Sequence, residues 1–293
     1  MNKTILTAAL ALSLITSAHA QLSALTVSGT MDYESQYIFR GKKVTNSALQ
    51  PSVNFAYPYA NGSINAFVWT SQPIGRSSNG STGVGGQGPN QNNEIDAGIA
   101  YDHPLSGWSD DTTLEVGYQL YWYPDFGGNN NSGAGLVSRS HEFHIGATYD
   151  STKLIGYNLS PSLFYYHDII LDSNTLQLGL AYSYDLSDML GVKGVSLNPS
   201  ANLGWTSIHR AGGDQSQGLA PGQSDEWNNS YIYWQLNAEL DYKLNTSTTF
   251  FLGLHYAGNT DGTSNGYGAT TTNPQFPGSD SSFWGGAGVK FNM

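Results

Sequence analysis

Twelve segments of this chain alternate apolar and polar residues, and the connectors between them are by turns short and long. Successive side chains of a β-strand point to opposite faces, so alternation places the two faces of each segment in different environments. Short connectors at one end of the strands and long ones at the other indicate antiparallel neighbours whose ends face different compartments. The layout is typical of an all-β fold, a single transmembrane antiparallel up-and-down β-barrel.

The alternation is clearest where Leu114, Val116 and Tyr118 oppose Glu115 and Gln119. An even count of twelve strands agrees with what single-chain bacterial barrels contain. The first segment is longer than a membrane crossing needs, so we expect its end to rise above the membrane. The expected strands are residues 25–40, 48–57, 63–71, 94–102, 114–122, 141–149, 158–168, 176–185, 195–207, 232–242, 250–256 and 281–292.

Two of these segments depart from simple alternation. Pro51 lies inside the second segment, and because proline has no N–H to donate to a neighbouring strand, we expect a bulge or irregularity there. In the third segment Val68 is apolar on one face, while Phe67 and Trp69 are apolar on the other. The sequence therefore leaves open which face of that strand meets lipid.

The N-terminal residues resemble a secretory signal peptide. Lys3 provides a positive charge, residues 5–15 form an apolar core, and Ala18-His19-Ala20 matches a cleavage site. We expect residues 1–20 to be removed and residues 21–293 to form one outer-membrane barrel. The chain has no cysteine, so an exported domain of this length depends on hydrogen bonding and burial instead of disulfides.

Composition excludes two other classes of protein. Mean hydropathy is −0.32 and no run of 18 apolar residues follows residue 20, which argues against a membrane-spanning helix. Loss of Lys3 leaves 10 basic residues against 22 acidic ones, a net charge of −12. Nucleic acid is then not an expected partner, because phosphate binding requires positive charge.

A secreted β-sandwich, lectin or propeller would show the same alternation, because one strand face would meet a dry core and the other water. Two features favour the membrane instead: the charged strand residues fall almost entirely on one face, and aromatic residues gather at the ends of the other, as in interfacial girdles. Those aromatic residues are Tyr37, Phe39, Tyr57, Tyr101, Trp122, Tyr182, Tyr184, Tyr242 and Tyr256.

The polar face predicts an acidic lumen. Ten carboxylates on it stand against two bases, so a water-filled interior would have a negative potential and favour cations. The alternative is a plugged interior in which these groups pair with each other and with polar side chains. The candidate pore-lining residues are Asp32, Glu34, Arg40, Glu94, Asp96, Glu115, Glu142, Asp168, Asp185, Glu239, Asp241 and Lys290.

Arg40 is the most distinctive of these candidates. It ends the first segment on the inward face, beside Gly41 and Lys42. One interpretation is a positive element at a constriction or mouth. The other is an arginine paired with Glu34 or with an acid of a neighbouring strand.

Catalytic and metal-binding motifs are not apparent. His141 and His144 are three residues apart, which puts them on opposite faces of a strand and prevents them from sharing a metal ion. The G-x-S-x-G nucleophile motif is absent. We expect no enzyme activity, cofactor or metal, although an enzyme acting on envelope lipids stays as an alternative.

Four stretches resemble the TorF-type putative porin family. They are residues 33–41 (YESQYIFRG), 93–96 (NEID), 116–124 (VGYQLYWYP) and 141–147 (HEFHIGA), in the order of the family's motifs. The resemblance covers most of the first half of the mature chain. It implies an outer-membrane barrel with a presumed pore function, and it brings no established substrate and no catalytic residues.

The chain departs from that family in three places. Lys42 and Lys43 follow Arg-Gly where small polar residues are expected, three loops look longer than usual, and Met293 stands in place of a terminal aromatic residue.

Together these observations predict a porin-like passive channel for small hydrophilic solutes or ions, with a preference for cations. The alternative is a plugged structural or adhesive barrel that acts through its extracellular loops. Expected partners are outer-membrane lipids, lipopolysaccharide and, during biogenesis, the barrel-assembly machinery; a homo-oligomer is left open. The expected location is the outer membrane of a Gram-negative envelope.

Overall fold

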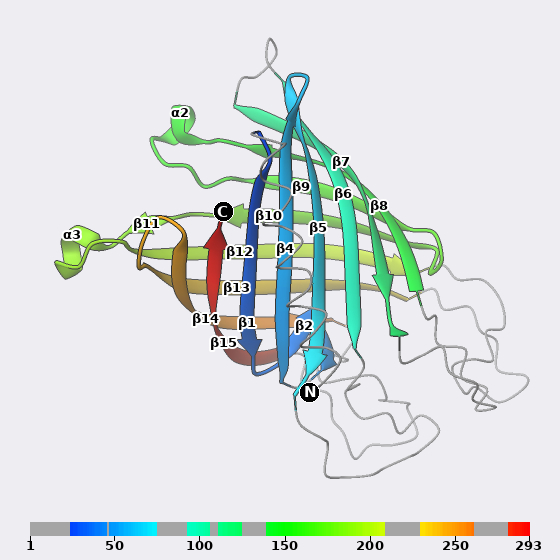
Figure 1. Ribbon diagram of the computed structural model, residues 1–293. Helices are drawn as coiled ribbons and strands as arrows, with labels where there is room; N and C mark the ends of the chain where they lie inside the picture. The colour runs from blue at the N-terminus through cyan, green and yellow to red at the C-terminus, as the bar shows by residue number, and fades with distance from the viewer. Residues whose placement is uncertain are drawn as a thin grey trace, which may run out of the picture.

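The computed structural model is a closed antiparallel barrel of twelve strands (Figure 1). It describes residues 24–45, 47–74, 93–105, 111–124, 139–208, 229–260 and 281–293. The expected signal peptide, residues 1–20, lies outside this described part. Within it, neither helix is long and apolar enough to cross a membrane.

The barrel wall contains β1, β4 to β10 and β12 to β15, and three short strands and two helices lie in its connectors. The wall strands are β1 Thr26–Glu34, β4 Ala48–Tyr59, β5 Gly62–Pro73, β6 Glu94–Pro104, β7 Thr112–Trp122, β8 Arg139–Tyr149, β9 Ser162–Asp168, β10 Ser173–Ala181, β12 Val195–Ile208, β13 Asn229–Lys243, β14 Thr248–Asn259 and β15 Ser281–Asn292. The other elements are β2 Tyr37–Phe39, β3 Lys42–Thr45, β11 Tyr184–Asp185, α2 Thr152–Ile155 and α3 Ser187–Leu190.

Each wall strand pairs with its neighbours in the chain, and the first and last strands pair with each other. β1 pairs with β4 on one side and with β15 on the other, where Ser28 lies opposite Asn292. β10 also pairs with β12, which completes the circle of strands. A closed barrel leaves no unpaired strand edge, as a membrane requires.

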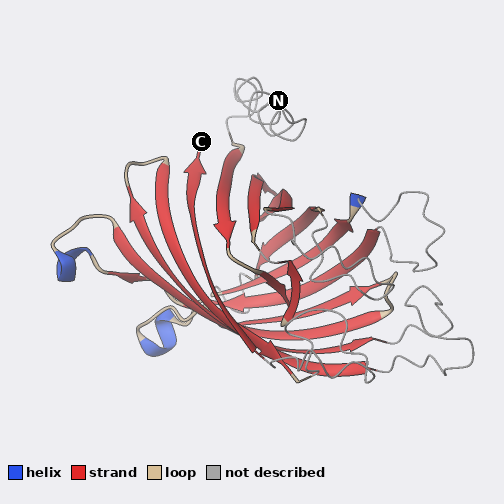
Figure 2. Cartoon of the chain, turned by 90° about the horizontal axis from the view of Figure 1, so that it is seen from below, coloured by secondary structure: helices blue, strands red, loops and turns tan. Residues whose placement is uncertain are grey.

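The two ends of the barrel differ. The rim where β5, β7, β12 and β14 end carries the long connectors, and we call it the long-connector rim. The opposite end, the short-connector rim, carries tight turns and the two helices. The first wall strand begins and the last one ends at this rim, where the Met293 N–H donates to the Val27 carbonyl. Figure 2 shows α2 and α3 on turns that project from this side.

The outward face of the wall is apolar. Residues such as Leu178, Leu236 and Leu252 are more than half exposed at mid-strand. Aromatic residues on the same face include Tyr57 and Trp122 near strand ends. Exposed apolar residues ringing a closed barrel are the pattern of a wall that meets lipid, which confirms the predicted fold class.

The expected strands agree with the wall except at the first and eighth. The wall strand β1 ends at Glu34, and residues 37–45 form a separate hairpin of β2 and β3, so the prediction of one strand over 25–40 is wrong. The eighth segment is interrupted only at residues 182 and 183, and β11 then continues along β12 in the same register as β10. At Pro51 the pairing of β4 with β5 is interrupted, but the register is the same on both sides, so there is no bulge.

The structure shows which face of β5 meets lipid. Val68 is exposed on the outer face, whereas Trp69 packs inside against Tyr37, with ring centroids 5.2 Å apart. Tyr37 and Phe39 lie inside the barrel as well, because they belong to the hairpin. Their assignment to an outer aromatic girdle is therefore wrong.

Candidate functional site

The β2–β3 hairpin folds into the barrel at the long-connector rim. Arg40 and Gly41 form its two-residue turn, both at positive φ (47° and 75°), as in a type I′ turn. The Asn259 side chain of β14 donates to the Gly41 carbonyl at 2.7 Å, and Ile38 forms a buried apolar cluster with Ala257 and Trp284. The hairpin therefore occupies part of the lumen.

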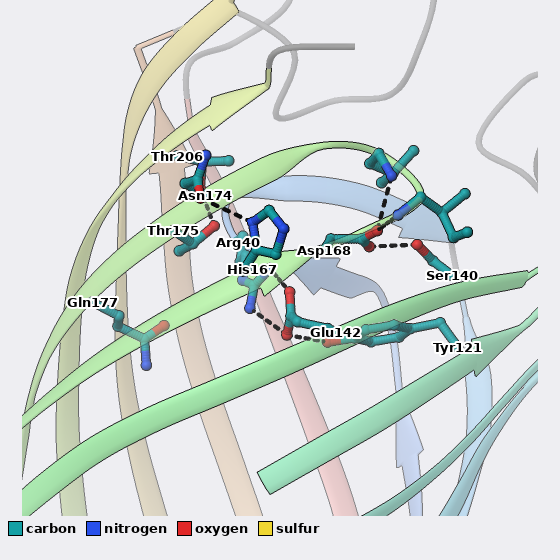
Figure 3. A network of polar contacts seen from close by, with 12 residues as sticks. Arg40, Tyr121, Ser140, Glu142, His167, Asp168, Asn174, Thr175, Gln177 and Thr206 are labelled. Atoms are coloured by element: carbon teal, nitrogen blue, oxygen red, sulfur yellow. Dashed lines mark hydrogen bonds and ion pairs between the residues drawn. The ribbon is translucent and has the colours of Figure 1, made fainter. Parts of the chain in front are cut away.

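Arg40 reaches across the lumen to the opposite wall (Figure 3). Its Nη1 and Nη2 donate to the two carboxylate oxygens of Glu142 at 2.7 and 2.9 Å, and the Tyr121 hydroxyl donates to the same carboxylate at 2.9 Å. The guanidinium also lies over the rings of Phe39 and Tyr166, 4.7 and 4.6 Å from their centroids. Paired and planar contacts of this kind suit arginine better than lysine.

The charge of Arg40 is stable in this setting. Burial opposes the charged guanidinium, but the Glu142 carboxylate and its hydrogen bonds outweigh burial and raise the pKa of Arg40 above its usual value. Glu142 itself is almost completely buried. Arg40 is ion-paired, as the second interpretation expects, but its partner is neither Glu34 nor an acid of an adjacent strand; a role at a constriction stays a prediction.

A second group of acids lies beside β2. The Tyr123 hydroxyl donates to Glu94 at 3.0 Å, while one oxygen of Glu94 and one of Asp96 are buried with no hydrogen-bond partner in the described part of the chain. Burial raises the pKa of Tyr37, and the nearby charges of Glu94 and Asp96 raise it further. Tyr37, Trp69 and Asp96 line a cavity of about 300 Å³.

Other acids lie nearer the short-connector rim. Asp102 accepts from Asn65 at 2.8 Å, and Glu115 is 2.8 Å from His144. These four residues line a second cavity of about 320 Å³. Asp102 is not among the predicted candidates, although it lies on the same face of its strand as Glu94 and Asp96, a signal that identifies it.

The other predicted base forms a separate cluster. Lys290 Nζ donates to Glu239 at 2.5 Å and to both oxygens of Asp241 at 3.1 Å. On the same side of the barrel, Glu34 is 3.5 Å from His255.

Three candidates remain: Asp32 lies within β1, opposite Gly288 of β15 and Gln50 of β4, and the other two lie at the rims. Ser140 and the N–H groups of residues 170 and 171 donate to Asp168, which therefore organises the β9–β10 turn (Figure 3). Asp185 is exposed beyond the barrel wall and accepts from the Ser187 N–H at the start of α3. The register along β12 is the same on both sides of the break (Ala181 opposite Ser200, Asp185 opposite Ser196), so Asp185 keeps its predicted face, but it is exposed at the rim instead of enclosed in the lumen.

The two histidines of the 141–147 motif lie on opposite faces as expected. His141 Nδ1 forms a hydrogen bond of 2.5 Å with the Tyr118 hydroxyl, whereas His144 Nε2 contacts the Glu115 carboxylate inside the barrel. In the described part of the chain no three histidine or acidic residues come together as metal ligands.

The four stretches that resemble the TorF-type family meet around the hairpin. Arg40 of the first stretch pairs with Glu142 of the fourth, and Phe39 packs on Tyr121 of the third at 5.8 Å between ring centroids. Tyr123 of the third stretch donates to Glu94 of the second. Segments far apart in the sequence thus form one contact network around the hairpin.

Comparison with known proteins gives structural likeness only. No family model and no curated protein matches the sequence. Three solved structures share its backbone arrangement in part. They are a KdgM porin (TM-score 0.47, 11% identity, covering 91% of this chain and 99% of that one), the NanC porin (0.47, 13%, 92% and 100%) and a mutant of the TodX monoaromatic hydrocarbon channel (0.41, 13%, 92% and 88%). At this similarity they assign neither family nor function, and membership of the TorF-type family stays a prediction.

Proposed function

We propose that this protein is a passive outer-membrane channel for small hydrophilic solutes or ions and that it favours cations. The observation that carries the proposal is a closed barrel that is apolar outside and lined by carboxylates inside. The inward carboxylates of the described wall are Asp32, Glu34, Glu94, Asp96, Asp102, Glu115, Glu142, Asp168, Glu239 and Asp241.

Charge pairing inside the barrel supports the cation preference. Arg40 is neutralised by Glu142, and Lys290 by Glu239 and Asp241. The other inward carboxylates have no lysine or arginine within ion-pair distance in the described part of the chain. A lumen with this balance has a negative potential, which concentrates cations and repels anions.

Two further points belong to this proposal. The meeting of the four family-like stretches at the constriction supports a TorF-type porin, in which these motifs would set the width of the pore. An apolar outer wall supports the location in the outer membrane, surrounded by its lipids and lipopolysaccharide after insertion by the barrel-assembly machinery.

Single-channel recording in a planar bilayer tests the function. We expect discrete conductance steps and, in a KCl gradient, a reversal potential on the side of K⁺ selectivity. Heat-modifiable mobility on gels verifies that the protein used is the folded barrel. Absence of steps from such protein, or a clear anion preference, contradicts the proposal.

A second candidate, a plugged barrel that acts through its long connectors, is favoured by the hairpin. Ile38 is buried and the Arg40–Glu142 pair crosses the lumen, so the hairpin could close the rim instead of narrowing it. Replacing residues 37–45 by a short Gly-Ser link decides between the two. A narrowed channel conducts before the deletion and conducts more after it, whereas a closed barrel conducts only after the deletion.

A further inference from the structure

The cavity beside β2 contains an acid without a counter-charge. Asp96 lines it, is 4% exposed, and has one oxygen with no hydrogen-bond partner in the described part of the chain. Glu94, two residues earlier on the same strand face, is 1% exposed and also has an unpartnered oxygen. Two buried carboxylates this close repel each other when both are ionised, so a bound cation would stabilise them.

The rest of the cavity is aromatic. Tyr37 of the hairpin and Trp69 of β5 pack with their ring planes at 58°, and Phe67 forms part of the same lining. In the wall, Asp96 lies opposite Trp69 in the pairing of β5 with β6. An aromatic surface next to a carboxylate offers a cation both charge and ring-face contact.

The cavity also opens to the lumen. Asn54, part of its lining, is an exposed residue at an inward position of β4. Its volume of about 300 Å³ is at the lower end of the range for small-molecule sites. A small solute inside the barrel therefore has access to the cavity that Asp96 lines.

We propose that this cavity binds a small organic ammonium ion, with Asp96 as counter-ion and Tyr37 and Trp69 as the ring surface. A divalent metal fits less well, because Ca²⁺ takes six to eight oxygen ligands and Mg²⁺ about six, and the described residues hold no such group. An alkylated ammonium is weakly hydrated and suits aromatic faces. The inference deepens the proposed channel function, on which it rests for access through the lumen, by naming a class of solute.

Choline is a suitable probe, and its binding can be measured without conductance. Saturation transfer from the folded barrel in detergent micelles to the choline methyl protons gives the affinity. Asp96→Asn, which keeps the shape of the side chain, should weaken binding by about tenfold or more. Trp69→Leu should weaken it by about threefold or more through loss of the ring face.

The comparison variant is Asp102→Asn, which removes the same charge from the other cavity and should change choline affinity by less than about twofold. Heat-modifiable mobility establishes that each variant is folded. No transfer to choline on the folded wild-type barrel, equal losses in Asp96→Asn and Asp102→Asn, or displacement of choline by Na⁺ at equal concentration would each overturn the site.

Failure of this site and failure of the channel are separable. A barrel that binds choline through Asp96 but gives no conductance steps supports the site and contradicts the channel. A barrel that conducts but does not bind choline supports the channel and contradicts the site.

Discussion

Arg40 and Glu142 form a two-point ion pair that joins the turn of the β2–β3 hairpin to β8, between residues 102 positions apart in the chain. Both side chains are almost completely buried, 12% and 2% exposed. The pair therefore holds the hairpin across the lumen. It also makes the position of the hairpin dependent on two charges that must be present together.

Arg40→Met should destabilise the barrel by about 3–5 kcal/mol, because it leaves the Glu142 carboxylate buried without its partner. The double variant Arg40→Met/Glu142→Gln should be more stable than Arg40→Met alone, since no unpaired charge is then left. Urea unfolding of the reconstituted barrel measures both values. Lys153→Met is the control: Lys153 is 67% exposed where it pairs with Asp111, and the loss of stability should stay below about 1 kcal/mol. Similar losses for Arg40 and Lys153 would show that the buried pair does not hold the hairpin.

Gly41→Ala should cost more stability than the same change at Gly156. Both glycines have positive φ (75° and 79°), so both substitutions introduce backbone strain of about 1–2 kcal/mol. A Cβ on Gly41 would also lie 2.6 Å from the Gly258 carbonyl oxygen and 2.8 Å from the Tyr233 Cβ, whereas nothing lies within 4 Å at Gly156. The added clash should cost about 1–3 kcal/mol more. Equal unfolding free energies for the two variants would mean that the hairpin does not sit against β13 and β14 in solution.

Leu236→Arg should lower the stability of the barrel in lipid vesicles by about 2–4 kcal/mol, because position 236 is at mid-strand on the outward face. Leu190→Arg is a matched control. Both leucines are 51% exposed, but Leu190 is on α3, outside the wall. It should change the folding free energy by less than about 0.5 kcal/mol. If both substitutions are equally mild, the wall faces water and the membrane assignment is wrong.

Asp102→Asn combined with Glu115→Gln should reduce the ratio of K⁺ to Cl⁻ permeability by roughly twofold, because it removes two negative charges from the cavity near the short-connector rim. Reversal potentials in a KCl gradient measure the ratio. Asp150→Asn serves as the comparison, since Asp150 is fully exposed in a connector, and it should leave the ratio unchanged. A ratio that does not respond to the double change contradicts a lumen whose carboxylates select the ion.

Much of the lumen could be predicted from residue order. Glu115, Glu142, Glu239 and Asp241 are on the inward side because alternation continues without interruption along their strands. Asp185 keeps its predicted face but is not enclosed in the lumen, because it lies exposed at the rim, where it accepts a hydrogen bond from the Ser187 N–H. The partner of Arg40 could not be predicted, since pairing across a barrel depends on strands that are distant in sequence.

By itself, the sequence determined the wall: a period of two along each segment separates a lipid side from a polar side whatever the register between strands. Only the tertiary structure decided what fills the interior. Tyr37 to Arg40 continue the same alternation as β1, so no local pattern distinguishes a rising strand from a hairpin that turns inward. The difference comes from contacts with β5, β7, β8 and β14, which form only once the barrel has closed and brought those strands around the hairpin.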